Sequence, residues 1–312
     1  MEDLYLSVII PCYNEEAVIN ETYERVKRVL CDNGINRHEI IFINDGSRDE
    51  TFNTLKMIAA ADKEVKLVDF SRNFGHQPAV TAGIHFASGD IAIIIDADLQ
   101  DPPELFPAMI EVYKKEHCHV VYGVREEREG ESWMKKITAR YFYKLIKNLS
   151  ETPVPLDTGD FRLIDKAIIN EFKKITESNK FIRGIISWIG FKQVPFYYKR
   201  NERLAGKTKY PVRKMIRFAM TGIMYFSKKP LKICVTIGLF CTVLALFLIL
   251  YVLYGYFFSD KAVSGWASTL IIVIFFSGIQ LVSLGLVAQY VANIFDEVKN
   301  RPEYIIAQKI NF

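Results

Sequence analysis

The stretch Ile91-Ala92-Ile93-Ile94-Ile95-Asp96-Ala97-Asp98-Leu99-Gln100 places two carboxylates, two residues apart, at the end of an uninterrupted apolar run. A short apolar run rich in isoleucine is typical of a buried strand. Because side chains alternate along a strand, Asp96 and Asp98 share one side as the chain leaves the sheet, and Gln100 joins them if the extension persists. Such oxygen ligands favour Mg²⁺ or Mn²⁺. The stretch predicts a strand that ends at a divalent metal site, although a D-x-D pair alone also occurs in solvated loops.

The residues around this stretch alternate between strand-like and helix-like patterns. We expect strands over 6–10, 39–44, 65–69, 91–96 and 120–124, and helices over 15–31, 51–61 and 78–87. Apolar, β-branched strands without polar alternation indicate a mostly parallel sheet that is covered on both faces. The fold class is therefore α/β, and ligands of such sheets bind beyond the carboxyl ends of the strands.

Polar residues follow the first four of these strands. They are Pro11-Cys12-Tyr13-Asn14-Glu15, Asn44-Asp45-Gly46-Ser47, Asp69-Phe70-Ser71-Arg72-Asn73 and Asp96-Ala97-Asp98. Asp45 and Glu15 can accept hydrogen bonds from a base and a ribose, and Tyr13 can stack on the base. Neither G-x-G-x-x-G nor G-x-x-x-x-G-K-[ST] is present, which removes the usual support for a dinucleotide site or a P-loop. A metal-held diphosphate is also a leaving group, so the pattern predicts glycosyl transfer from a nucleotide sugar.

Two apolar runs occupy the C-terminal part, over 231–258 and 268–294. Each is long enough to cross a bilayer, and the connector between them is short, so we expect a transmembrane hairpin. Lys228, Lys229 and Lys232 lie near the start of the first run, and Lys299 and Arg301 follow the second. The positive-inside rule then puts both termini in the cytoplasm. The predicted domains are a catalytic domain over 1–229, the hairpin over 230–294 and a cytoplasmic tail over 295–312, of which residues 301–312 can fold back onto the domain.

Composition excludes several other classes of protein. The net charge of +4 over 312 residues is too small to indicate nucleic-acid binding, and the five cysteines show no C-x-x-C spacing of a zinc ribbon. No signal peptide is recognisable, because the first apolar run is short and ends at Pro11. The histidines at 76, 85, 117 and 119 lack the spacing of a metal site on a single element, and we expect surface or packing roles for them.

Basic residues and aromatics mix in two segments, over 133–149 and 211–226. Each is an expected amphipathic helix that suits the headgroup layer of an anionic membrane. For 133–149, docking on the soluble domain is an equally good interpretation. Gly278, Ser283 and Gly285 in the second apolar run allow close helix approach, which makes a homo-oligomer plausible.

Five segments together resemble the motifs of family 2 glycosyltransferases. They are Pro11-Cys12-Tyr13-Asn14-Glu15-Glu16, Asn44-Asp45-Gly46-Ser47, Ser71-Arg72-Asn73-Phe74-Gly75, Asp96-Ala97-Asp98-Leu99-Gln100-Asp101-Pro102-Pro103-Glu104 and Thr158-Gly159-Asp160-Phe161-Arg162. The branch with dolichol-phosphate mannose synthase and the bacterial polyprenyl-phosphate glycosyltransferases is the most similar, and the two apolar runs resemble the bactoprenol glucosyltransferases in particular. The resemblance covers essentially the whole chain and implies a GT-A type nucleotide-sugar-binding domain.

The resemblance also implies roles for individual residues. The positions matching the base and ribose site are Pro11, Tyr13, Glu15, Ile43 and Asp45. Those matching the metal and diphosphate site are Asp96, Ala97, Asp98 and Gln100. Basic residues that bind phosphates of the donor or the acceptor match Arg125, Arg203 and Lys209. A further basic position on the acceptor side matches Lys135. Ala139 stands where some relatives have a hydroxyl residue. Asp98, Asp160, Arg125 and Arg203 are the candidate catalytic residues.

The acceptor that the resemblance implies is a polyprenyl phosphate, whose oxygen is already anionic at neutral pH. Cations that reduce the repulsion between nucleophile and donor therefore matter more than a base, and guanidinium binds phosphate bidentately. Asp160 can orient the acceptor or a sugar hydroxyl, act as a base, or cap a turn.

The expected function is inverting transfer of one hexose, with glucose as the first candidate, from a UDP- or GDP-sugar. Transfer of mannose from GDP-mannose is the alternative within the same branch. A processive synthase is disfavoured by the missing Q-x-x-R-W motif. A transporter of lipid-linked sugar is disfavoured because neither apolar run holds an ionisable residue deep inside it. A nucleotide-binding anchor without catalysis is the remaining hypothesis.

Overall fold

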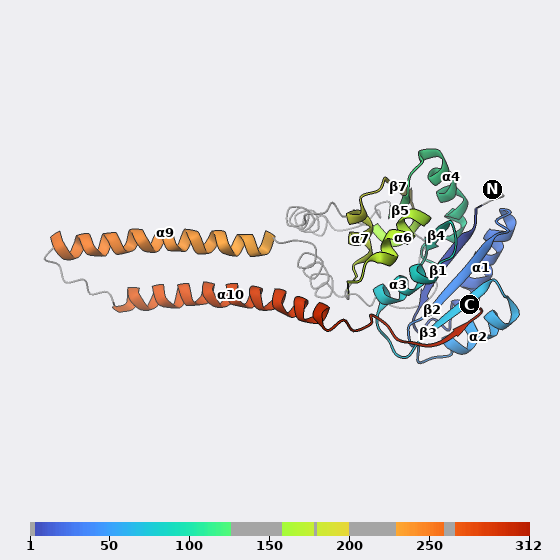
Figure 1. The fold of residues 1–312 in the computed structure, drawn as a ribbon, viewed down its shortest axis with the longest axis horizontal. Coiled ribbons are helices and arrows are strands. Elements are labelled where there is room, and N and C mark those ends of the chain that lie inside the picture. Colours follow the sequence, from blue (N-terminus) through green and yellow to red (C-terminus); the bar gives the residue numbers. More distant parts are fainter. Residues whose placement is uncertain (1–3, 126–157, 178–179, 200–228, 259–265) are drawn as a thin grey trace. The chain divides into compact units, whose positions relative to one another are not determined.

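The structure, a computed structural model, describes residues 4–125, 158–177, 180–199, 229–258 and 266–312 (Figure 1). The strands of this part are β1 (Leu6–Cys12), β2 (His38–Asn44), β3 (Val65–Phe70), β4 (Ile91–Ile94), β5 (Val120–Arg125), β6 (Thr158–Asp165), β7 (Gln193–Tyr198) and β8 (Ile306–Ile310). The helices are α1 (Ile19–Asp32), α2 (Thr51–Ala61), α3 (His76–Phe86), the 3-10 helix η1 (Pro103–Leu105), α4 (Phe106–Glu116), α6 (Lys166–Lys174), α7 (Ile182–Ile189), α9 (Lys229–Phe258) and α10 (Trp266–Val298).

The chain divides into two compact units. One contains Met1–Tyr143, Thr152–Val212 and Arg301–Phe312, and the other contains Lys144–Glu151 and Arg213–Asn300. The last twelve residues thus return to the first unit after α10. The sheet lies entirely in the first unit, and α9 and α10 lie in the second.

The described strands form one mixed sheet in the order β7-β5-β6-β4-β1-β2-β3-β8. Its centre is parallel, because β1 pairs in parallel with both β2 and β4, and β2 pairs in parallel with β3. Strands β6 and β8 run against their neighbours. The carboxyl ends of the parallel strands therefore lie at one edge, and the amino ends of β6 and β8 lie at the same edge.

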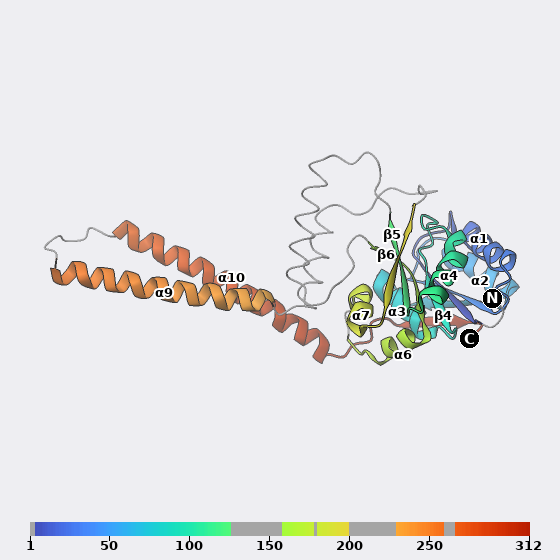
Figure 2. The same cartoon turned by 90° about the horizontal axis from the view of Figure 1, so that it is seen from above.

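Helices cover both faces of the sheet. Helices α1, α2 and α4 lie on one face, and α3, α6 and α7 lie on the other (Figure 1, Figure 2). The first face holds the apolar core, to which β1 contributes Leu6, Val8 and Ile10. Every residue of β1 and β2 is buried, which agrees with the continuous apolar strands expected of a doubly covered sheet.

Strand β8 is the C-terminal segment of the chain, shown in red beside β3 in Figure 1. It pairs antiparallel with β3, with an irregularity at Asp69 and Phe70. The amide nitrogen of the Asn311 side chain donates to the carbonyls of Ala59 and Val65, at 2.6 and 2.8 Å. The expectation that the tail folds back onto the domain is confirmed.

Several element boundaries differ from those expected, and two of them border the site. Helix α1 begins at Ile19 rather than at residue 15, because the backbone N–H groups of Glu15 and Glu16 donate to Thr51, the first residue of α2, and to Asp49 just before it. Strand β4 ends at Ile94 rather than at residue 96, since the chain turns after Ile95. Helix α2 has the bounds that the sequence predicted.

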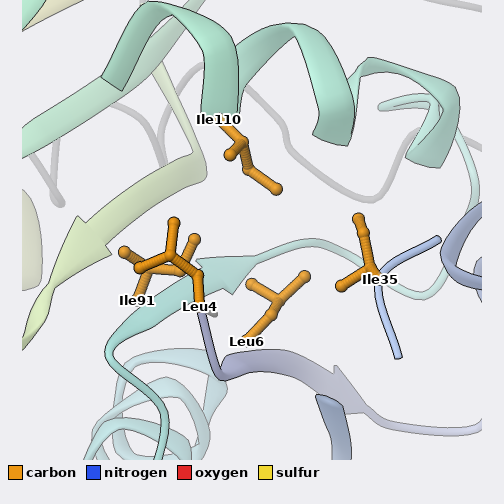
Figure 3. Close-up of a pocket in the computed structure, with 5 residues that line it drawn as sticks. All are labelled: Leu4, Leu6, Ile35, Ile91 and Ile110. Carbon is orange, nitrogen blue, oxygen red and sulfur yellow. The ribbon is translucent and has the colours of Figure 1, made fainter. Parts of the chain in front are cut away.

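A small cavity lies at the opposite edge of the sheet from the polar strand ends. It measures about 10 Å³ and is lined by Leu4, Leu6, Ile35, Ile91 and Ile110, whose side chains surround it in Figure 3. An apolar space of this size stays dry, because a water molecule would find no hydrogen-bond partner there. This cavity is therefore a packing gap and not a ligand site.

Helices α9 and α10 are apolar along most of their length. Within the described residues, Phe275–Val298 of α10 is long and apolar enough to cross a membrane, and α9 contains the shorter apolar run Leu231–Leu244. Large apolar side chains such as Phe247 and Val282 are exposed at 65 and 73 %. Exposed apolar surface of this extent marks contact with a membrane or another protein.

Candidate active site

The register of the parallel strands brings three polar strand ends level with one another. Cys12 of β1 pairs with Asn44 of β2, and Asn44 pairs with Asp69 of β3. The backbone N–H of Asp45 then donates to the carbonyl of Cys12 at 2.9 Å. The convergence of these ends, expected from the sequence, is confirmed.

Asp45 is buried beneath the loop Ser71–Gly75. Its carboxylate accepts hydrogen bonds from the backbone N–H groups of Phe74 at 2.6 Å and Gly75 at 2.9 Å, and from the side chain of Asn73 at 2.8 Å. Burial raises the pKa of the Asp45 carboxyl, and the two backbone hydrogen bonds oppose this rise. Asp45 therefore fixes the shape of the loop that borders the site.

Gly46 allows this loop to approach. Its φ is +61°, and an added Cβ would lie 2.3 Å from the carbonyl carbon of Arg72 and 2.6 Å from the backbone nitrogen of Asn73. Only glycine fits, because the left-handed conformation and the adjacent backbone both exclude a side chain.

We expect Gly46→Ala to lower the free energy of unfolding by about 3 kcal/mol or more, since backbone atoms must move to admit the methyl group. Gly34→Ala is the matched control, because Gly34 has a φ of +64° with nothing within 4 Å of an added Cβ. The control should lose only the conformational cost of about 1 kcal/mol. Denaturant titration of both variants in detergent measures the difference, and equal losses would show that the loop does not press on Gly46.

The segment Asp96–Gln100 forms a turn. Leu99 has a φ of +54°, and the backbone N–H of Gln100 donates to the Asp98 carboxylate at 3.2 Å. Asp96 and Asp98 are partly exposed, whereas Gln100 is 4 % exposed. The extension on which Gln100 depended as a third ligand does not persist, because the backbone is left-handed at Leu99, and a metal-binding role for Gln100 stays a prediction. Thr22 of α1 stabilises the turn, because its hydroxyl donates to the carbonyl of Ala97 at 2.8 Å.

Asp160 lies beside Asp96 because β6 runs antiparallel to β4. Ile94 pairs with Arg162, so Asp96, two positions after Ile94, faces Asp160, two positions before Arg162, at the sheet edge. His76 lies between the two acids: its Nε2 is 2.9 Å from the Asp160 carboxylate and 3.7 Å from that of Asp96. Arg183 of α7 donates from its Nε to the other Asp160 oxygen at 2.7 Å.

The charges of this cluster change the pKa of each member. Burial and the neighbouring carboxylates Asp160, Asp101 and Asp98 raise the pKa of Asp96, while His76 opposes the rise. Burial would raise the pKa of Asp160, but Arg183 and His76 hold it well below its usual range. For His76, burial acts to lower the pKa, but the hydrogen bond to Asp160 and the charges of both acids raise it to about 9.

Arg125 ends β5 at the same sheet edge. Its guanidinium lies against Gly159, where an added Cβ would be 2.7 Å from an arginine nitrogen. It also lies 3.7 Å from the buried Asp101, which accepts a hydrogen bond of 2.5 Å from the Tyr198 hydroxyl. Arg125 thus supplies a positive charge next to the start of β6.

The remaining predicted donor residues line the end of β1 and its neighbours. Tyr13 is partly exposed, and Glu15 is partly exposed after it, whereas Pro11 and Ile43 are buried in paired strands. A buried Ile43 can reach a ligand only through its backbone. The predicted cations Lys135, Arg203 and Lys209, together with Ala139 and the expected helices over 133–149 and 211–226, lie outside the described residues.

Sequence analysis missed two residues of the site, His76 and Arg183. His76 does not fit the surface or packing role expected of it, since it bridges two acids. Its position directly after the Ser71–Gly75 motif was the available signal. No comparable signal marks Arg183, because its contact with Asp160 depends on how α7 packs against α3 and β6.

The comparisons agree with this architecture. The family model described as glycosyl transferase family 2 matches residues 7–172. An uncharacterized glycosyltransferase of Bacillus subtilis, YkcC, is 47 % identical over 96 % of this chain and 92 % of its own length. The SfII prophage-derived bactoprenol glucosyl transferase of Shigella flexneri is 37 % identical over 96 % of this chain and 97 % of its own, and the prophage bactoprenol glucosyl transferase homolog of Escherichia coli is 37 % identical over 96 and 98 %.

Among solved structures, a mannosyltransferase of Pyrobaculum calidifontis in complex with GDP-Man and Mn²⁺ aligns with 94 % of this chain and 88 % of that chain, at 15 % identity and a TM-score of 0.48. The family match runs from β1 to β6 and includes Asp45, Asp96, Asp98 and Asp160. The sheet is a GT-A-like α/β fold, and the chain belongs to glycosyl transferase family 2 and is a glycosyltransferase.

Proposed function

We propose that this glycosyltransferase transfers a single hexose, with glucose as the first candidate, from a nucleotide sugar to a polyprenyl phosphate, with inversion. The observation that carries the proposal is the meeting of Asp96, Asp98 and the ionised Asp160 at the edge where Asp45 and Arg125 also lie. Near-full-length similarity to proteins named bactoprenol glucosyl transferase supports the lipid acceptor.

The donor is proposed to lie across the carboxyl ends of β1, β2 and β4. Tyr13 is accessible for stacking on the base, and Glu15 offers a carboxylate to the ribose. Asp45 has both oxygens engaged by the Ser71–Gly75 loop, so its main contribution is to hold that loop against the donor. Pro11, Ile43 and Ala97 contribute backbone and shape, because their side chains are buried.

Mg²⁺ or Mn²⁺ is the proposed cofactor, and the residues present fit it. Asp96 and Asp98 are partly exposed carboxylates in one turn, and burial, together with repulsion from Asp160, Asp101 and Asp98, raises the pKa of Asp96. No three His, Cys, Asp or Glu side chains of the described residues form a complete metal centre. Mg²⁺ is often held by one or two carboxylates together with substrate phosphates, which matches two aspartates and a diphosphate. The bound metal would neutralise charge that develops on the leaving diphosphate.

Asp160 is proposed to position the reactants. A carboxyl whose pKa is held far below neutrality is a poor proton acceptor, so orientation explains its role better than base catalysis. A phosphate oxygen of the acceptor needs no deprotonation, and Arg125 can bind it bidentately. Arg203 and Lys209 are proposed for the donor phosphates and Lys135 for the acceptor.

The membrane placement is also part of the proposal. We propose that α9 and α10 span a membrane as a hairpin, with the catalytic domain over 1–229 and the tail over 295–312 on the cytoplasmic side. The exposed apolar surface of both helices and the lysines and arginine at their ends support this topology. The segments over 133–149 and 211–226 are proposed to lie at the membrane surface, and the chain to form a homo-oligomer.

The experiment is a donor panel with purified full-length protein. UDP-glucose, UDP-galactose, GDP-mannose and other nucleotide sugars are each mixed with Mn²⁺ or Mg²⁺, in vesicles with and without undecaprenyl phosphate. We expect one donor to be consumed only when both metal and lipid phosphate are present, with the hexose recovered on the lipid. If GDP-mannose is the one donor of the panel that is consumed, the transferred hexose is mannose and not glucose. Binding of nucleotide without any release of nucleoside diphosphate would contradict transferase activity toward these acceptors.

A further inference from the structure

Three consecutive residues of the C-terminal tail contact three different segments that support the active site. Glu303, Tyr304 and Ile305 precede β8, whose first pairing partner is Phe70 at the end of β3. Because β8 runs antiparallel to β3, these three residues lie at the sheet edge that carries the site. None of them belongs to the motifs that the sequence analysis assigned.

Ile305 and Tyr304 hold the loop that covers Asp45. The carbonyl of Ile305 accepts a hydrogen bond of 2.9 Å from the backbone N–H of Ser71, the first residue of the loop. The Tyr304 ring stacks on Phe70, with 4.8 Å between ring centroids and 10° between planes. Phe70 in turn packs edge-on against Phe74, whose N–H donates to Asp45. Tail and loop are thus joined at both the backbone and the aromatic side chains.

Tyr304 also contacts α3. Its hydroxyl lies 3.1 Å from Nδ1 of His85, in the last turn of the helix. Burial and the charges of Lys180 and Lys173 lower the pKa of His85 to about 4, so the imidazole is neutral at physiological pH. The first turn of the same helix carries His76 and Gln77, which both contact the Asp160 carboxylate.

Glu303 contacts the segment that leads into α7. Its carboxylate forms an ion pair with Lys180, and the two side chains are only 9 and 5 % exposed. Arg183 follows in the first turn of α7 and donates to Asp160. A buried ion pair fixes its surroundings, because separating it leaves an uncompensated charge. The tail is therefore linked through three paths to Asp45 and to the two helices, α3 and α7, whose side chains contact Asp160.

We propose that the C-terminal segment Arg301–Phe312 is a working part of the donor site, in which Glu303 and Tyr304 act as positioning residues for the Ser71–Gly75 loop and for the supports of Asp160. The effect on donor binding rests on the proposed function, in which the loop borders the donor. The effect on the order of the loop does not depend on which donor binds.

The experiment compares Tyr304→Ala, Tyr304→Phe and Gln308→Ala in the full-length protein in detergent. Amide hydrogen exchange of peptides covering Phe70–Gly75 reports loop order, and steady-state kinetics with the donor identified above separate KM from kcat. For Tyr304→Ala we expect exchange to be faster and the donor KM to rise by up to about tenfold, which is the scale of one lost aromatic pair. The value of kcat should change less than KM, because the lost contact orders the loop and does not touch the reacting atoms. Tyr304→Phe keeps the stacked ring, so its loop exchange and its donor KM should be close to those of the unmodified protein.

Gln308→Ala is the control, because Gln308 is exposed in β8 and pairs through its backbone. Its exchange and KM should match the unmodified protein. Should Tyr304→Ala fail to fold, Tyr304→Leu keeps apolar bulk without the ring and carries the same expectation. Loop exchange and donor KM that equal the control would overturn the proposal. Faster loop exchange in Tyr304→Ala with an unchanged donor KM would refute the role of the tail in donor binding, and it would not contradict the proposed function.

Discussion

Replacement of Asp98 by asparagine is expected to reduce turnover by about 1,000-fold or more, because stabilising the leaving diphosphate through a metal is worth several kcal/mol. Asp98 is accessible in the turn after β4, and asparagine keeps its volume while removing the charge. The loss should therefore arise from metal affinity and not from a change of fold. Release of nucleoside diphosphate, measured across a titration of Mn²⁺, tests this expectation.

Asp90→Asn is the matched control for Asp98→Asn. Asp90 precedes the same strand at its opposite end, where its carboxylate accepts a hydrogen bond from the backbone N–H of Tyr5. Asparagine can accept that bond, so turnover and its metal dependence should remain. Full activity of the unmodified protein in the presence of EDTA would rule out the metal site, as would normal turnover of Asp98→Asn at every metal concentration.

Replacement of Asp160 by asparagine is expected to lower kcat by about 100-fold, the scale seen when a positioned charge is lost from a preorganised site. The side chain is 8 % exposed and is held by His76 at 2.9 Å and Arg183 at 2.7 Å. Without the carboxylate these two cations repel each other, so stability should fall as well, by about 3 kcal/mol. Single-turnover measurements with saturating donor and acceptor separate the catalytic loss from weaker binding.

Asp165→Asn distinguishes a catalytic effect from a structural one. Asp165 lies on the same strand, caps α6 through the N–H of Ile168 and contacts His119 at 2.7 Å. Asparagine caps a helix about as well as aspartate does, so the variant should keep the cap, lose only the charge beside His119, and leave kcat unchanged. Equal losses of kcat in the two variants would show that Asp160 acts only through the stability of β6.

The parallel centre of the sheet follows from local sequence. Strands β1 and β2 consist mainly of apolar residues, β3 buries its apolar residues beside the partly exposed Lys66 and Asp69, and each strand is followed by a polar segment and a helix. Such a pattern permits few topologies, because crossover connections between parallel strands are right-handed. The level arrangement of Cys12, Asn44 and Asp69 then follows from the parallel register, which is why Asp45 and the Asp96–Asp98 pair could be predicted at one edge.

The supports of Asp160 could not be predicted in this way. Strand β6 enters antiparallel, and only its register against β4 decides that Asp160 and not a neighbour faces Asp96. The contact with Arg183 depends on packing between α7 and the sheet. The left-handed backbone at Leu99, with Gln100 buried after it, likewise does not follow from the alternation of side chains along a strand.

The amino-acid sequence by itself determined the α/β class, the polar strand ends and the acidic pair, because these depend on residue type and on spacing within single segments. Tertiary structure alone decided the partners of Asp160, the loop over Asp45 and the contacts of Glu303 and Tyr304. Those arise between residues up to about 250 positions apart, for example Tyr304 and Phe70 or His85. Their distances are set by strand order and helix packing, which involve the free energy of the whole fold rather than the preferences of any one segment.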